Sequence, residues 1–247
     1  MHKKLLQIFL FTIPLCVNAI NIPTPTALKH SKQLILVITK NWRANNGTLQ
    51  LFQRKNTSSK WQPTSQPAPI IVGQTGLAWG ANYRKFHLIG PYKTEGDNKS
   101  PAGTFPLKYA FGFAPTKDKK IKLSYIPIKN STVCVADSKS KYYNQIIDYE
   151  KITSPDWQDQ EVMHNFWQYK YGIVVDYNRP KSQPYRGSCI FIHIWNWPNS
   201  IGTAGCTSMS EKNLKKILYW LSPKDNPIMV QLPKKQYEVL RKPWKLP

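Results

Sequence analysis

The chain contains 247 residues, 41% of them hydrophobic, which is enough for a substantial hydrophobic core. No Gly/Ser-rich linker, low-complexity tract or internal repeat divides it, which excludes a repeat array and a string of linked domains. Its formal net charge is +22, and the basic residues are spread along the chain. A charge of this size favours anionic partners in general, although a solvated basic surface without a specific partner explains the charge equally well.

Residues 1–19 have the features of a secretory signal peptide. Lys3 and Lys4 give a positive start, residues 5–17 form a short apolar stretch, and the small residue Ala19 fits a cleavage site. The alternative is an uncleaved anchor, but the apolar stretch is short for a membrane span. We therefore expect a mature chain without a membrane span, in the periplasm or at the cell wall. For an exported protein, anionic envelope polymers are better partners than nucleic acid.

Strand signals dominate the remaining residues, 20–247, which we expect to form one β-rich domain. Runs of β-branched residues and period-two alternation predict strands, in chain order, at residues 33–39, 47–53, 61–63, 70–73, 121–128, 172–177, 189–195 and 228–232. We expect a glycine-rich turn at residues 73–80 and a turn leading into an extended segment at 100–107. Residues 20–30 and the tail from Lys234 are predicted to be loosely held.

Two helices are predicted from their start signals. Ser154, followed by Pro and Asp, suggests a helix over residues 155–166. Ser208 and Glu211 match a capping box ahead of apolar residues at helical spacing, which predicts a helix over residues 209–221.

The predicted strands at residues 172–177 and 189–195 are expected to pair with one another. Alternation places the three isoleucines of the second strand on one face, which should be the core. The other face should look into a cleft, and it carries Phe191, His193 and Trp195.

Three cysteines remain after the signal peptide: Cys134, Cys189 and Cys206. An odd number in an exported chain predicts one disulfide and one free thiol. We expect Cys134 to pair with Cys189, a bridge worth roughly 4 kcal/mol in the loop-entropy treatment. The alternative pairing of Cys189 with Cys206 would remove any nucleophile at position 206.

Cys206 and His193 are the candidate catalytic pair. Cys206 follows His193 by thirteen positions and precedes the predicted helix, so a helix dipole and an imidazolium could both stabilise its thiolate. Gly205 permits close approach of the backbone, and the amides around Gly205 and Thr207 could form an oxyanion hole. The alternative is an inert buried thiol beside a core histidine. The histidines lack metal-ligand spacing, so we expect neither a metal nor a cofactor.

These residues resemble the signature of the L,D-transpeptidase catalytic domain (YkuD-type) family, in which a His precedes Ser/Thr-His-Gly-Cys. The matching residues are His193, Thr203, Gly205 and Cys206. Residues 100–105 (SPAGTF) also resemble the family's Thr-Pro-x-Gly-x-Phe element, and the resemblance runs from about residue 67 to 233. The chain departs from the signature in a shorter His-to-Cys gap, an insertion around residues 115–170, and at Ala204, Thr207 and Ser208.

The resemblance implies a mainly β fold with a few α-helices, an L,D-transpeptidase-like mixed sheet or sandwich with a helix after the nucleophile. It also implies acyl transfer on peptidoglycan stem peptides, with a thioester on Cys206 that an amine or water resolves. His193 would be the base, and Thr203 would contact the substrate. Independently of the resemblance, Trp195 is a candidate for stacking on the substrate, and a packing role explains it equally well. The alternative is a non-catalytic peptidoglycan- or envelope-binding protein that retains the fold, which the changes at Ala204 and Ser208 favour.

Overall fold

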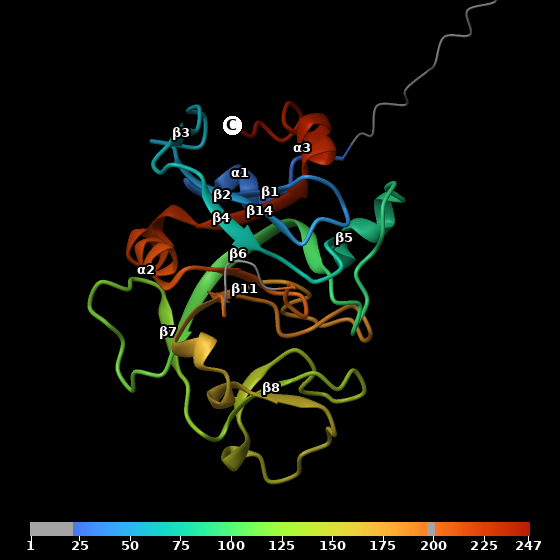
Figure 1. Ribbon diagram of the computed structural model, residues 1–247, viewed down its shortest axis with the longest axis vertical. Coiled ribbons are helices and arrows are strands. Elements are labelled where there is room, and N and C mark those ends of the chain that lie inside the picture. The colour runs from blue at the N-terminus through green and yellow to red at the C-terminus, as the bar shows by residue number, and fades with distance from the viewer. Residues whose placement is uncertain (1–21, 197–200) are drawn as a thin grey trace, which may run out of the picture.

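A computed structural model describes residues 22–196 and 201–247 (Figure 1). The predicted signal peptide lies outside these residues. The fold is mainly β with few helices, as expected. No helix within the described residues is long and apolar enough to cross a membrane.

The main sheet contains eleven strands and is mixed. Its strands are β1 Gln33–Thr39, β2 Asn46–Gln53, β3 Gln62–Pro63, β4 Ala68–Ile71, β5 Leu77–Trp79, β6 Ser100–Gly112, β7 Ser124–Pro127, β11 Tyr171–Val175, β12 Phe191–Ile194, β13 Thr207–Met209 and β14 Ile228–Pro233. They pair in the order β1-β14-β6-β11-β12-β13-β4-β2-β3, and β1 also pairs with β2. The sheet therefore closes on itself, and its inner face holds the main core.

A second sheet of three strands forms a separate layer, drawn in yellow tones around β8 at the bottom of Figure 1. It consists of β8 Thr132–Val135, β9 Ile146–Asp148 and β10 Gln160–Val162. The disulfide Cys134–Cys189 joins β8 to the residues just before β12, and its predicted pairing is confirmed. The insertion around residues 115–170 is thus fastened covalently beside the β11–β12 hairpin.

Three α-helices accompany the sheets: α1 Thr26–His30, α2 Glu211–Trp220 and α3 Lys234–Leu240. Short 3-10 helices connect the strands: η1 Ala81–Phe86, η2 Tyr149–Lys151, η3 Met163–Asn165, η4 Trp167–Lys170 and η5 Pro223–Asp225. The apolar face of α2, formed by Leu214, Ile217 and Leu218, is buried in the main core.

The prediction of a helix over residues 155–166 is wrong. The stretch contains β10 and η3 instead, and β10 pairs antiparallel with β8. The Asp156 carboxylate accepts a hydrogen bond from the Ser140 hydroxyl at 2.6 Å rather than supporting a first helical turn. Pairing with a cross-linked strand outweighs the local start signal at Ser154.

The start of the helix after Cys206 was also predicted wrongly. Residues 207–209 form β13, and α2 begins at Glu211 with Ser210 as its cap, accepting from the Asn213 amide at 3.4 Å. Glu211 pairs with Lys170 at 3.1 Å. Cys206 therefore does not lie at a helix N-terminus, and the dipole proposed to stabilise its thiolate is absent there.

The ends of the chain are held more firmly than predicted. Leu28 lies in the core, and the segment after Lys234 forms α3 and buries Trp244. The Trp244 indole donates to the Ile22 carbonyl at 3.3 Å, so the C-terminal segment contacts the start of the described residues. The predicted turn at residues 73–80 also contains β5, which pairs with β6.

Residues 100–105 belong to a long strand rather than to a turn. β6 begins at Ser100, and Gly103 has a φ of 137°, a conformation that favours glycine. A Cβ at Gly103 would lie 2.2 Å from the Tyr83 ring. The glycine of this motif is therefore explained by the buried tyrosine that packs against it.

Gly103→Ala is expected to destabilise the fold by about 1–3 kcal/mol, because the new methyl group displaces the Tyr83 ring. Gly96→Ala is the matched control, since Gly96 also has a positive φ but its added Cβ would meet nothing within 4 Å. Denaturant unfolding of both variants measures the difference. Equal losses in the two variants would contradict a role for the contact with Tyr83.

Candidate active site

A cavity of about 530 Å³ contains both candidate catalytic residues, Cys206 and His193. Residues from the main sheet and from the three-stranded sheet line it together. The predicted residues Thr203, Gly205 and Trp195 are among them. The structure thus brings most of the predicted site residues together in one cavity.

The pairing of β12 with β13 explains why these residues meet. The strands are parallel, with Ile192 opposite Thr207 and His193 opposite Ser208. Because side chains alternate along a strand, Cys206 and Ser208 share the face that carries His193. The opposite face of β12 holds Ile192 and Ile194 in the core, as predicted.

Cys206 is a free thiol, as predicted, and is only 7% exposed. Its Sγ accepts from the Phe191 amide at 3.3 Å and donates to the Cys189 carbonyl at 3.5 Å. Burial, and then the Glu161 carboxylate, raise the pKa of the thiol to about 12, although the Phe191 amide opposes this shift. The resting sulfur is therefore a neutral thiol, which corrects the expected low-pKa thiolate.

His193 is neutral at physiological pH. Burial lowers the pKa of its imidazole to about 4, which corrects the expected imidazolium. Nδ1 lies 2.7 Å from the Ile194 carbonyl, which can only accept, so Nδ1 carries the proton. Nε2 is left with a free lone pair. Among the hydrogen bonds of the described residues, His193 makes none to Cys206, whose sulfur is held by backbone groups instead.

The turn before Cys206 is held by two hydroxyl groups. Thr203 donates to the Cys206 carbonyl at 2.6 Å and accepts from the Gly205 amide at 3.1 Å. Ser100, the first residue of β6, donates to the same Cys206 carbonyl at 2.8 Å. Gly205 has a φ of 153°, which favours glycine. The two sequence motifs are therefore joined by direct hydrogen bonds at Cys206.

Comparison with protein-family models matches residues 44–230 to the L,D-transpeptidase catalytic domain (YkuD). The chain belongs to the L,D-transpeptidase catalytic domain family. A search of curated proteins found no match. Among solved structures, the helical cell shape determining protein Pgp2 from Campylobacter jejuni is similar at 16% identity and a TM-score of 0.41. The similarity covers 83% of this chain and 48% of that one, so the chain spans about half the length of Pgp2.

The departures from the L,D-transpeptidase signature can be placed in this structure. Ala204 lines the cavity where the signature has its second histidine, and Ser208 lines it beside His193. Thr207 lies outside the cavity lining, and its hydroxyl donates to Gln231 at 2.8 Å in the core. The oxyanion role of the amides near Gly205 and Thr207, like the substrate contacts of Thr203 and Trp195, stays a prediction.

Three charged or polar residues of the site were not singled out from the sequence. Glu161 and Tyr169 line the cavity. Lys93 is not part of the lining but lies close to Gly205, and its charge opposes the rise in the Cys206 pKa. Lys93 is 2% exposed and pairs with Asp97 at 2.5 Å. No local motif marks these residues, because each reaches the site through tertiary packing. The only sequence signal was an acidic residue, Glu161, in a strongly basic chain.

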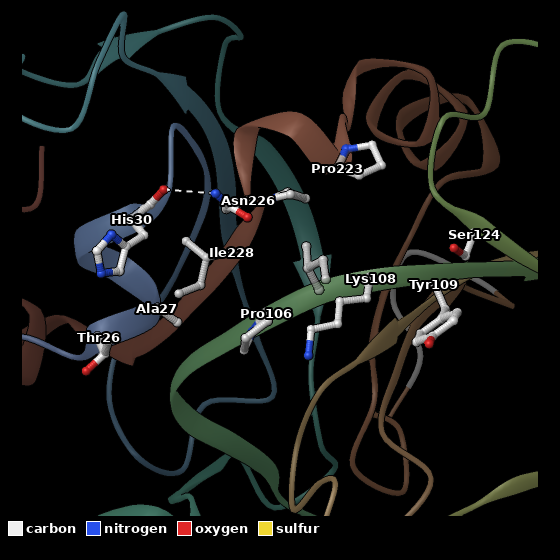
Figure 2. A pocket seen from close by; sticks show the side chains of 12 residues that line it. Thr26, Ala27, His30, Pro106, Lys108, Tyr109, Ser124, Pro223, Asn226 and Ile228 are labelled. Carbon is white, nitrogen blue, oxygen red and sulfur yellow. Dashed lines mark hydrogen bonds between the residues drawn. The ribbon is translucent and has the colours of Figure 1, made fainter.

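No group of three His, Cys, Asp or Glu side chains within residues 22–196 and 201–247 could hold a metal ion. A second cavity of about 620 Å³ lies between α1, β6 and β14 (Figure 2). Its lining includes His30 and Lys108 but contains no cysteine or carboxylate. The Asn226 amide there donates to the His30 carbonyl at 3.3 Å. The larger hollow therefore lacks the nucleophile and acid groups of the Cys206 cavity.

Proposed function

We propose that this protein is a cysteine acyltransferase that acts on the stem peptides of peptidoglycan in the periplasm or at the cell wall. The observation that carries the proposal is the free Cys206 thiol, which shares a cavity with the Nε2 lone pair of His193 in a chain of the L,D-transpeptidase family. The basic surface would favour docking on anionic envelope polymers.

In the first half of the reaction, Cys206 Sγ attacks the carbonyl carbon at the third stem residue while His193 Nε2 takes the thiol proton. The tetrahedral intermediate then expels the amine of the terminal D-Ala, which receives that proton from His193. The product is a thioester on Cys206 and free D-Ala. A neutral thiol and a neutral imidazole are the correct starting states for this transfer.

In the second half, an acceptor amine or water attacks the thioester and gives its proton to His193. The sulfur leaves as a thiolate and recovers the proton. An amine acceptor gives a cross-link, and water gives an L,D-carboxypeptidase. The missing hydrogen bond between His193 and Cys206 has to form as substrate binds, which is common for catalytic contacts that are long in the free enzyme.

The second candidate function is a non-catalytic peptidoglycan-binding protein. The observation that favours it is the attachment of the Cys206 sulfur to backbone groups of Phe191 and Cys189 rather than to the imidazole. Ala204 in place of the second histidine points the same way. The two candidates share the fold and the cavity and differ in whether the sulfur reacts.

Mass spectrometry after exposure to a carbapenem separates these candidates. The proposed enzyme should acquire one covalent adduct, mapped to Cys206, which is lost in Cys206→Ala. Cys206→Ala should still bind peptidoglycan in a sedimentation assay, because only the sulfur is removed. A wild-type protein that sediments with peptidoglycan but stays unmodified would contradict the enzyme and favour the binding protein.

A further inference from the structure

Glu161 and Tyr169 form a hydrogen-bonded pair beside the candidate nucleophile. The Tyr169 hydroxyl donates to Glu161 Oε1 at 2.7 Å. The Tyr169 ring is buried and lies edge-on to His193, with centroids 5.3 Å apart, and to Phe191 at 5.5 Å. One phenol thus touches the imidazole and also the residue whose amide holds the Cys206 sulfur.

Tyr169 and Cys206 line the same cavity, and both belong to one cluster of buried side chains that also contains Phe191. Burial raises the pKa of the Cys206 thiol most and the Glu161 carboxylate raises it further, whereas the nearby Tyr169 hydroxyl lowers it. The pKa of Tyr169 itself is raised by burial first and then by the nearby sulfur and carboxylate. Tyr169 has one hydroxyl proton, so it can donate to Glu161 or to a thiolate at Cys206, but not fully to both.

We propose that Tyr169 is a further catalytic residue, which hydrogen-bonds the Cys206 thiolate, and that Glu161 is a positioning residue that competes for the same hydroxyl proton. This inference rests on the proposed cysteine chemistry. An ionised Glu161 retains the hydrogen bond from the Tyr169 hydroxyl, and its negative charge disfavours a thiolate at Cys206. A protonated Glu161 is neutral and needs no donor, so the phenol can turn to the thiolate. The thiolate is the leaving group in the second half of the reaction and gains most from this contact.

The position of Glu161 is fixed by the disulfide-linked layer. Glu161 lies directly opposite Cys134 in the β8–β10 ladder, and Cys134 is bonded to Cys189. Cys189 in turn offers its carbonyl to the Cys206 thiol. The inserted three-stranded sheet therefore positions the Glu161 carboxyl group at the site, because β10 pairs with the cross-linked strand β8.

Burial raises the pKa of Glu161 to about 7. Glu161 therefore competes for the Tyr169 hydroxyl proton above about pH 7 and stops competing as it becomes protonated at lower pH. The other charged or titratable groups around this pair are His193, Lys93 and Glu95. His193 is neutral above about pH 4, Lys93 is ion-paired with Asp97, and Glu95 accepts the Tyr143 hydroxyl. Glu161 is therefore expected to titrate near neutral pH in this cavity.

The test is the alkylation rate of Cys206 by iodoacetamide between about pH 5 and pH 9, because the thiolate is the reactive form. Peptide mapping assigns the modification to Cys206. Tyr169→Phe should slow alkylation by about tenfold below about pH 6, where Glu161 is neutral and the phenol is free to donate to the sulfur; this corresponds to a rise of about one unit in the thiol pKa. Glu161→Gln should accelerate it by about tenfold above pH 7 and leave it unchanged below about pH 6, where Glu161 is already neutral.

Tyr83→Phe is the matched control, since Tyr83 is a buried tyrosine that hydrogen-bonds Thr104 and does not line the cavity. Where the thiol is too shielded for iodoacetamide, the rate of modification by the smaller reagent methyl methanethiosulfonate across the same pH range should show the same opposite changes. Shifts in the same direction for Tyr169→Phe and Glu161→Gln, or shifts no larger than in Tyr83→Phe, would overturn the proposal. Alkylation needs no substrate. The roles of Tyr169 and Glu161 can therefore be tested even if the protein forms no carbapenem adduct.

Discussion

Cys206→Ala is expected to abolish release of D-Ala from a stem tetrapeptide, and His193→Ala to lower kcat by about 10²–10⁴-fold. The losses differ because removing the sulfur removes the covalent route, whereas removing the imidazole removes general acid–base assistance. Product analysis by mass spectrometry measures both variants. Equal activity of His193→Ala and wild type would exclude His193 as the base.

The pH dependence of the proposed activity in the wild-type protein provides a second measure of the same assignment. Burial lowers the pKa of His193 to about 4, so Nε2 is available as a base at every pH above that value. As pH falls through about 4, protonation of Nε2 should remove activity. The acid limb assigned to His193 therefore lies near pH 4, well below the ordinary histidine value of about 6.5. His164→Ala is the matched control, because His164 is an exposed histidine outside the cavity lining.

Much of the sheet was predictable because its strands carry their burial pattern in the sequence. Residues 33–39 form β1 with the predicted bounds, and the pairing of residues 172–177 with 189–195 is confirmed. The alternation in β12 correctly separated the core isoleucines from the face with His193, but Phe191 on that face is fully buried in a second hydrophobic cluster and does not line the cavity as predicted. In these segments one period of hydrophobicity specifies both the strand and its buried face.

The segment after Cys206 shows why local signals failed at the site itself. Thr207 and Ser208 are polar and resemble a helix cap, yet they form β13. The Thr207 hydroxyl is satisfied by Gln231 in the core, and Ser208 pairs with His193 on one side and Ile71 on the other. These partners are distant in sequence, so a local capping signal carries no information about them.

The environment of the thiol was unpredictable for a related reason. A helix dipole and an imidazolium would lower a cysteine pKa, and neither acts on Cys206 in the structure. Burial and Glu161 dominate instead. Glu161 comes from a stretch whose sequence predicted a helix, and it reaches the cavity only because β10 pairs with the cross-linked strand β8.

Removing the disulfide is expected to cost about 4 kcal/mol of stability, because Cys134 and Cys189 are 55 residues apart and the bridge restricts that loop in the unfolded chain. For a chain of this length, the loss corresponds to a fall in Tm of about 8–16 °C. Cys134→Ala/Cys189→Ala, followed by thermal unfolding, measures it. A reductant should lower the Tm of wild type and leave that of the double variant unchanged.

The native fold should nevertheless survive without the bridge, because a second link joins the same segments. The Asn144 side chain accepts from the Cys189 amide at 3.0 Å and donates to the Tyr177 and Asn178 carbonyls. The double variant should therefore fold but hold Glu161 less firmly against Tyr169, and the difference in Cys206 alkylation between wild type and Glu161→Gln should shrink in that background. A Tm that is unchanged after reduction verified by mass would show that the loop is already restricted by these hydrogen bonds rather than by the disulfide.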